Sequence, residues 1–366
     1  MQHKTLTDDE LYIYSRQIVL GDIGYDGQLQ LRNATVCLVG VGGLGSSTAL
    51  KLTGMGVGKL RIVDRDIVSR SDLHRQYLYD AKSIGRPKVE VAAEKLNHLN
   101  PDVVIEAVPE SLNLLNVDDI IKGMNVVVDG LDRPQPRYLI NRTCHKRNIP
   151  YIFGAAIETY GQVTTLVPGQ TFCLECFMPG LQDDALPSCG TVGVHPSVLG
   201  IVSSIQVAEA VRLLTGKNPL LLNKLLNIDV REYEFDQVSL SADPACKVCG
   251  ENGINSTEGL TDQFFEETCA RDGRRNFVIS PKTRINIDLV QLSSVIKANH
   301  YTINFIGSMG VTFDALEIFT VCMLISGIMI VQTPPRTQED YKPRILSIYK
   351  QLLVDGLGYP LQILPL

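Results

Sequence analysis

The chain has 366 residues, of which 20% are charged, and its formal net charge is −6. This length allows two domains with a sizeable core, and the absence of strong positive charge argues against a nucleic-acid partner. The polar N-terminal segment lacks the apolar core of a secretory signal, and no run approaches the roughly 18 apolar residues of a membrane span. We therefore expect a cytoplasmic protein that binds neither nucleic acid nor membranes.

The first elements in chain order predict one β–α–β unit. Thr7 and Glu10 predict a capping box that begins an amphipathic helix. The apolar run at 34–40 is typical of a buried parallel strand, and a glycine-rich turn and a helix to about Met55 follow it. A strand over 59–64 completes the unit.

The alternation of helices and strands continues over the next hundred residues. Helices are expected over 87–99, near 114–122 and over 136–147, and strands over 102–108, 125–130 and 151–158. This order predicts a Rossmann-like α/β fold with a mostly parallel, doubly wound sheet. Later strands, at 161–168 and within 222–238, are expected to run antiparallel at one edge, with a long apolar helix over 197–216 between them.

A polar, glycine-bearing stretch at 251–262 predicts a linker between a first domain at 1–250 and a small α+β domain at 263–366. In the second domain, strands are expected over 276–280, 301–307, 310–326 and 327–334, and helices over 288–299 and 338–354. The longest apolar run of the chain falls here, and Ser326-Gly327 interrupts it, so it is interpreted as two buried strands joined by a turn.

The turn after the first strand fits G-x-G-x-x-G through Gly40, Gly42 and Gly45, and Asp64 ends the next strand. Such glycines let the backbone approach a phosphate, the helix N-terminus supplies positive partial charge, and the carboxylate binds ribose hydroxyls. The motif does not separate a dinucleotide from ATP. Taken alone, it would favour an NAD-dependent oxidoreductase.

Charged side chains that follow the predicted strands favour ATP instead. They are Asp64, Asp66, Arg70, Arg75, Lys88, Asp129 and Asp132. Each alone is more often a solvated surface charge. Because cations neutralise phosphates and an aspartate can hold magnesium, the group at successive strand ends indicates phosphoryl or adenylyl transfer rather than hydride transfer.

Four of the nine cysteines form two Cys-x-x-Cys pairs, Cys173 with Cys176 and Cys246 with Cys249. Without an export signal, this pattern favours a metal over disulfides. Four thiolates fill a tetrahedral zinc shell, so the zinc would be structural. A redox pair and four unrelated buried cysteines are the alternatives.

From about residue 8 to 250 the chain resembles the MoeB/ThiF/HesA family, whose wider group includes the ubiquitin-activating enzymes. The matching segments are YSRQIVLGDIG, VGVGGLGSS, IVDRDIV, DLHRQ, GRPKVE, DGLDRPQPRYLIN, CLECFMPG, CGTVGVHPSVLGIVSSIQVAEAVRLLTG and CKVCG. The resemblance implies that ATP, with magnesium, adenylylates the C-terminal glycine of a small ubiquitin-like modifier or sulfur-carrier protein that ends in Gly-Gly.

The resemblance also implies roles for individual residues. Gly43, beside Gly40 and Gly42, would lie against the nucleotide, and Asp64 would bind ribose. Asp66 is also expected among the cofactor-binding residues. Arg75 and Lys88 would contact the phosphates, Asp132 would bind magnesium, and Arg16 would reach into the ATP site of the partner protomer in a homodimer.

Two positions depart from the family pattern. Asp72 stands where the family usually has Asn, and Arg133 follows Asp132 where Asn or Ser is common. A carboxylate near phosphates repels them unless magnesium or an arginine offsets it. Both departures therefore bear on the phosphate contacts.

Cys189 lies outside both cysteine pairs, in the loop where the family places its reactive cysteine. The resemblance implies that its thiolate attacks the acyl-adenylate and forms a thioester, or a persulfide-linked intermediate in sulfur carriers. His195 nearby could lower the pKa of this thiol.

The last hundred residues contain no reactive-cysteine loop of the rhodanese kind and no cluster of catalytic residue types. We expect this domain to bind a protein, either the modifier or a downstream conjugating or sulfur-transfer protein. A stabilising or oligomerisation module is the alternative, and a catalytically silent scaffold subunit is an alternative for the whole chain.

Overall fold

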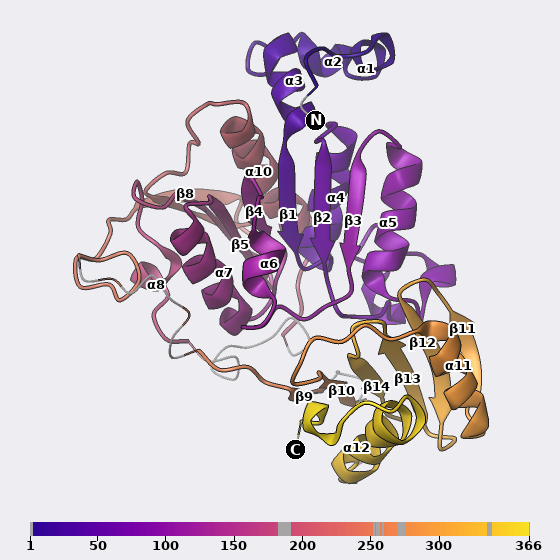
Figure 1. The fold of residues 1–366 in the computed structure, drawn as a ribbon. Coiled ribbons are helices and arrows are strands. Elements are labelled where there is room, and N and C mark those ends of the chain that lie inside the picture. Colours follow the sequence, from indigo (N-terminus) through magenta and orange to yellow (C-terminus); the bar gives the residue numbers. More distant parts are fainter. Residues whose placement is uncertain are drawn as a thin grey trace.

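Two β-sheets organise the chain in the computed structural model, which describes residues 3–181, 192–251, 253, 257, 260–269, 275–334 and 339–365 (Figure 1). The strands of the first sheet are β1 (Thr35–Val39), β2 (Lys59–Val63), β3 (Val104–Val108), β4 (Val126–Asp129), β5 (Tyr151–Ile157), β6 (Tyr160–Leu166), β7 (Lys224–Asp229) and β8 (Glu234–Ser239). The strands of the second sheet are β9 (Phe265–Cys269), β10 (Arg275–Ile279), β11 (Thr302–Ile306), β12 (Gly310–Ala315), β13 (Phe319–Leu324) and β14 (Met329–Gln332).

Helices cover both sheets. In the first part of the chain they are α1 (Asp8–Ile13), α2 (Ser15–Ile18), α3 (Gly24–Asn33), α4 (Gly43–Gly54), α5 (Lys88–Leu99), α6 (Val117–Ile121), α7 (Pro134–Arg147), α8 (Leu174–Phe177) and α10 (Pro196–Leu214). The second sheet carries α11 (Leu289–Ala298), α12 (Lys342–Lys350) and a π-helical turn at Gln351–Gly356.

The first sheet has the strand order β3-β2-β1-β4-β5-β6-β7-β8. Strands β1 to β5 are parallel and β6 to β8 are antiparallel, as predicted. One face packs on α4, α5 and α10, and the other on α6 and α7, so the sheet is doubly wound. The strand order reverses between β1 and β4, and folds of this kind bind ligands at the carboxyl ends of strands beside that point.

The N-terminal helix is shorter than the sequence predicts. The capping box of Thr7 and Glu10 is present, but α1 ends at Ile13 and α2 follows. Tyr14 lies at the break because its side chain is buried, and its hydroxyl accepts a hydrogen bond from Asn100 Nδ2 at 2.7 Å. Helix α3 was not predicted.

Helix α10 is long and apolar enough to cross a membrane, but half of its most apolar stretch is buried inside the fold. It packs on α4, β5 and β6. It is therefore the core helix of the first sheet, which is consistent with a soluble protein.

The second sheet is antiparallel, in the order β11-β12-β13-β14-β10-β9. Its α+β character and the turn at Ser326-Gly327 are as predicted, but the single strand expected over 310–326 is wrong. Leu316 and Glu317 both have positive φ there and form a turn between β12 and β13. Strand β9 was also missed.

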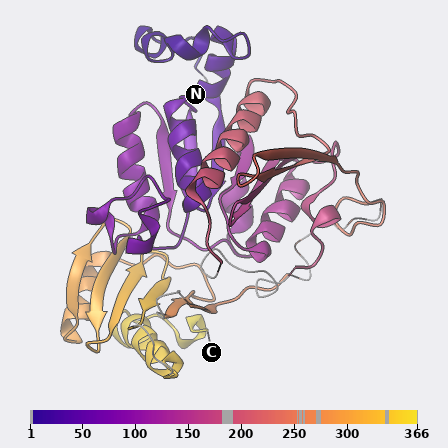
Figure 2. The same cartoon turned by 180° about the vertical axis from the view of Figure 1, so that it is seen from behind.

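The second sheet lies against the edge where the parallel strands of the first sheet end (Figures 1 and 2). Its face away from α11 and α12 packs on Ile67, which follows β2. Thr312 Oγ1 donates to Gly85 O at 2.6 Å, and Met309 N donates to Glu90 Oε2 at 3.0 Å. The region predicted as a separate domain therefore covers part of the edge that carries the candidate site.

Candidate active site

The glycine-rich turn joins β1 to α4 and is held by close backbone contacts. Gly40 has φ +90°. A Cβ on Gly45 would lie only 1.9 Å from Gly40 O, and a Cβ on Gly130 would lie 2.3 Å from the same atom. These three glycines let the ends of β1, β4 and α4 approach each other. Gly42 differs, because a Cβ there would meet no atom closer than Gln76 Nε2, at 3.9 Å. The space beside Gly42 is open.

Helix α4 begins at this turn with no side-chain cap on its first N–H groups. Unpaired N–H groups at the start of a helix attract anions, and the helix dipole adds to the attraction. A Cβ on Gly43 would lie 2.8 Å from the Leu199 side chain, so this glycine also lets α10 pack closely. The turn can therefore hold a phosphate.

Asp64 ties the end of β2 to the glycine turn. Its Oδ2 accepts from Val41 N at 2.7 Å, and its Oδ1 accepts from Asp66 N at 2.8 Å. Burial raises the pKa of Asp64, although nearby Lys88 opposes the shift. The carboxylate is thus fixed beside the turn, in the position that ribose hydroxyls require in this fold.

Lys88 provides a buried cation. Its Nζ lies 3.2 Å from Asp66 Oδ2 and 4.0 Å from Asp72 Oδ2, and its side chain is 7% exposed. Burial opposes the charge, but Asp66, Asp72 and Asp64 together hold the pKa of Lys88 well above its ordinary value. The Asp66 side chain remains 50% exposed. A charged lysine beside an accessible carboxylate can meet both a phosphate and a metal ion.

Asp72 is buried and well partnered, which explains how this departure from the family pattern is tolerated. It accepts hydrogen bonds from Ser69 N at 2.9 Å, Gln76 Nε2 at 2.8 Å and Arg75 Nη2 at 3.1 Å. Arg75 and Lys88 offset its charge. Arg75 remains partly exposed beside it.

The two aspartates after β4 have different environments. Asp129 is fully buried and accepts from Arg137 Nε at 2.9 Å, Tyr151 Oη at 2.7 Å and Leu131 N at 2.8 Å. Burial raises its pKa, and Arg137 counters the shift. Asp132 is exposed, and in the described part of the chain no hydrogen bond or ion pair engages its carboxylate. Asp129 is therefore a structural partner of Arg137, and Asp132 is the accessible carboxylate of the two.

Strand pairing brings these groups to one edge. Val39 at the end of β1 pairs with Val63 on one side and with Asp129 on the other. Residues that follow β1, β2 and β4 therefore surround the same crevice. The predicted nucleotide-site residues at this edge are Gly40, Gly42, Gly43, Asp64, Asp66, Arg75, Lys88 and Asp132.

Other predicted residues lie elsewhere. Arg16 is exposed on α2, at the opposite end of the sheet from the second sheet (Figure 1). Cys189 lies outside the described residues. His195 caps α10, where its Nδ1 accepts from Ser197 N at 3.2 Å.

The four paired cysteines come together in one cluster. Their sulfur atoms all lie within 4.8 Å of one another, with Sγ–Sγ distances of 3.6 Å for Cys173–Cys246 and 3.3 Å for Cys176–Cys249. Tetrahedral zinc with Zn–S bonds of about 2.3 Å needs sulfur atoms roughly 3.8 Å apart. The cluster therefore fits a closed, structural zinc site.

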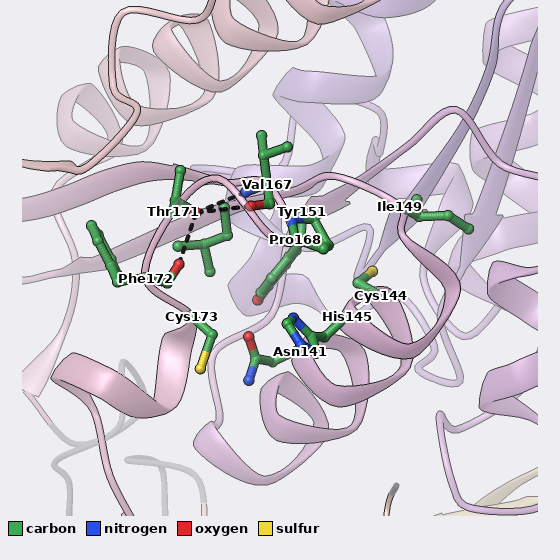
Figure 3. A pocket seen from close by; sticks show the side chains of 11 residues that line it. Asn141, Cys144, His145, Ile149, Tyr151, Val167, Pro168, Thr171, Phe172 and Cys173 are labelled. Carbon is green, nitrogen blue, oxygen red and sulfur yellow. Dashed lines mark hydrogen bonds between the residues drawn. The ribbon is translucent and has the colours of Figure 1, made fainter. Parts of the chain in front are cut away.

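A small cavity lies beside this cluster, between α7 and the ends of β5 and β6 (Figure 3). Asn141, Tyr151, Thr171 and Cys173 are among the residues that line it. Its volume of about 10 Å³ holds at most one water molecule. No charged residue of the carboxyl edge lines it, so it is not a substrate site.

Glu266, on β9, reaches this edge from the second sheet. It accepts hydrogen bonds from both terminal nitrogens of Arg65, one at 2.7 Å, and from Arg133 Nη1 at 2.5 Å. Sequence reasoning missed this residue because no motif surrounds it and 133 residues separate it from Arg133.

Fold and site define a doubly wound α/β protein with an anion-binding glycine turn, a buried lysine and an accessible carboxylate at one sheet edge. The chain belongs to the ThiF family, which matches residues 14–248. The predicted resemblance is thereby confirmed.

Similar proteins bear activating-enzyme and adenylyltransferase names. The SAMP-activating enzyme E1 of Haloferax volcanii is 38% identical over 267 residues, which cover 73% of this chain and 97% of the relative. The molybdopterin-synthase adenylyltransferase of Salmonella typhimurium is 35% identical over 247 residues, 67% of this chain and 99% of the relative. The crystal structure of E. coli MccB with ATP matches with a TM-score of 0.55 at 23% identity, covering 62% of this chain and 69% of MccB, which confirms the fold. The second sheet lies beyond the family match.

Proposed function

We propose that this protein uses ATP and magnesium to adenylylate the C-terminal glycine of a small ubiquitin-like modifier or sulfur-carrier protein. The observation that carries the proposal is the sheet edge where buried, charged Lys88 and Asp132 flank the glycine turn, with Asp132 unpaired among the described residues. The names of the similar proteins, a SAMP-activating enzyme and a molybdopterin-synthase adenylyltransferase, support it, as does the ATP-bound MccB of the same fold.

In this reaction an oxygen of the carrier carboxylate attacks the α-phosphorus of ATP. A new phosphorus–oxygen bond forms, the bond from the α-phosphorus to the bridging oxygen breaks, and pyrophosphate leaves with the electron pair. Lys88, Arg75 and the N–H groups at the start of α4 stabilise the charge on the phosphates. Asp64 orients the ribose.

The residues at the edge fit magnesium. The Asp132 carboxylate is exposed and has no ion-pair partner in the described part of the chain, and Asp66 is half exposed. Carboxylate oxygens of this kind are the ligands that magnesium takes beside nucleotide phosphates. When bound, the ion neutralises phosphate charge. Asp132 would hold it, with Asp66 as the second candidate.

Arg16 serves a neighbouring protomer in this proposal. It is exposed on α2, at the far end of its own sheet, where its guanidinium could enter the nucleotide site of a partner in a homodimer (Figure 1). Its neighbours in the sequence include exposed apolar side chains. They are Leu11, Tyr12, Ile13, Val19 and Leu20. Such a patch is typical of an interface between proteins.

Later steps involve parts of the chain beyond this edge. We place the thioester on Cys189, whose thiolate would attack the acyl-adenylate and release AMP. Residues 263–366 would then bind a downstream conjugating or sulfur-transfer protein. The cytoplasm is the compartment proposed for this chemistry.

ATP–pyrophosphate exchange tests the proposal. The full chain is mixed with ATP, magnesium and a carrier that ends in Gly-Gly, and with the same carrier lacking its last glycine. Exchange is expected only with the intact carrier, and Asp132→Asn should lower it by about 100-fold. Binding of NAD without ATP would instead support an oxidoreductase. Binding of ATP and carrier without exchange would support a silent scaffold.

A further inference from the structure

Glu266 forms a three-charge bridge between the two sheets. Its carboxylate accepts from Arg65 and from Arg133, and the side chains of Glu266, Arg65 and Arg133 are 13%, 18% and 29% exposed. Burial opposes its charge, but the arginines hold the pKa of Glu266 below its ordinary value. The carboxylate is therefore ionised and paired at neutral pH.

Both arginines are sequence neighbours of candidate nucleotide-site residues. Arg65 stands between Asp64 and Asp66, and Arg133 directly follows Asp132. Because both guanidinium groups pair with the same carboxylate, Glu266, they are held at the sheet edge that carries Asp66 and Asp132. Both donate hydrogen bonds to Glu266, and Arg65 Nη1 also donates to Ser111 Oγ at 3.0 Å. In the described part of the chain neither guanidinium group is hydrogen-bonded to Asp66 or Asp132.

A partly buried arginine that loses its carboxylate partner is stabilised by pairing with another carboxylate nearby, because burial weakens its hydration. Two site carboxylates are sequence neighbours of these arginines: Asp132 precedes Arg133, and Asp66 follows Arg65. Pairing with either would occupy an oxygen ligand that the proposed magnesium needs.

We propose that Glu266 is a positioning residue of the nucleotide site: it holds Arg65 and Arg133 away from Asp132 and Asp66, so that these carboxylates stay free for magnesium. The second sheet thereby completes a site that the first sheet alone would leave blocked. The inference rests on the proposed function. It also accounts for Arg133, which stands where the family commonly has Asn or Ser, as a partner of this additional sheet.

A second cross-sheet ion pair offers a matched control. Arg284 pairs with Asp119 at 2.7 Å and with Glu110 at 3.4 Å. It joins the same two parts of the chain but touches none of the residues of the nucleotide site. Arg284→Gln therefore tests docking of the sheets without disturbing Arg65 or Arg133.

The test measures binding, not turnover. A non-hydrolysable ATP analogue is titrated calorimetrically into the full-length protein at several magnesium concentrations, and bound Mn²⁺ is followed by electron paramagnetic resonance. In Glu266→Gln the metal concentration for half-saturation should rise by about fivefold or more, because freed arginine charge competes for the ligands. The double variant Glu266→Gln/Arg133→Asn should return to within about twofold of the wild type, and Arg284→Gln should match the wild type.

Two results would overturn the inference. One is an unchanged metal dependence in Glu266→Gln. The other is a double variant that stays as weak as Glu266→Gln, since a purely structural bridge would not be rescued by removing its second partner. Thermal unfolding of each variant identifies any that fail to fold, and Arg133→Asn alone, which keeps the Arg65–Glu266 pair, should bind metal normally. A wild type that binds no nucleotide would remove the proposed function, and this inference with it.

Discussion

The cysteine cluster and the carboxyl edge of the first sheet both gather side chains that attract cations, but they differ in how completely those side chains are partnered. Four sulfur atoms lie within 4.8 Å of one another and match one closed coordination shell. At the carboxyl edge, Asp129 is saturated by Arg137 and Tyr151, while Asp132 is left without a partner in the described part of the chain. We call side chains with a full set of partners within the protein closed groups, and those with accessible, unpaired atoms open groups. We expect closed groups to stabilise the fold and open groups to bind ligands.

The largest effect should follow loss of the cluster's metal. Cys246→Ser should lower the free energy of unfolding by about 5 kcal/mol or more, because binding of structural zinc contributes directly to folding. Calorimetry with metal analysis measures this. A chelator should destabilise the wild type in the same way and have no further effect on the variant. A metal-free wild type of unchanged stability would contradict the comparison.

Asp129→Asn should be the next largest change, and it should act on stability. It leaves buried Arg137 without a carboxylate, at a cost of about 3 kcal/mol. Denaturant unfolding measures the loss. Nucleotide binding by the fraction that stays folded should be retained. Loss of binding without loss of stability would place Asp129 among the open groups.

Asp132→Asn should show the opposite pattern. Exchange of ATP with pyrophosphate should fall by about 100-fold, equivalent to roughly 2.7 kcal/mol, with no change in the unfolding temperature. Asp102→Asn is the matched control, because Asp102 is also exposed but lies at the other end of the sheet, before β3. A similar loss in both variants would mean that the effect is not specific to the site.

The smallest expected effect is on thermal stability at acidic pH. The pKa of Glu266 is lowered in the folded state, so its pairing contributes stability that is complete above the unfolded pKa of about 4.3 and is lost as the pH falls through the folded value. Thermal unfolding from pH 6 down to pH 3 should therefore fall less steeply in Glu266→Gln than in the wild type. Equal slopes would show that Glu266 gains no stability from Arg65 and Arg133.

Local patterns predicted most of the first sheet and the glycine turn. Apolar runs, the capping box and G-x-G-x-x-G act within a few residues, so their structural consequences could be deduced directly from the sequence. The gathering of the residues that follow β1, β2 and β4 could also be predicted, because parallel strands bring their carboxyl ends to one edge of the sheet.

What the sequence could not reveal depends on contacts between distant segments. Asp129 and Asp132 look alike in sequence, and only the burial of Arg137 beside one of them separates their roles. Glu266 meets Arg133 across 133 residues, and β9 has no distinctive pattern of its own. The break between β12 and β13 falls at Leu316-Glu317, residues that rarely adopt positive φ.

Hydrogen exchange with and without magnesium and ATP tests the central claim most directly. Amides at residues 40–47, 64–75 and 129–133 should become protected when nucleotide binds, while those at 173–177 and 246–250, around the cysteine cluster, should not change. Protection confined to other parts of the chain, or none at the carboxyl edge under saturating nucleotide, would contradict the account.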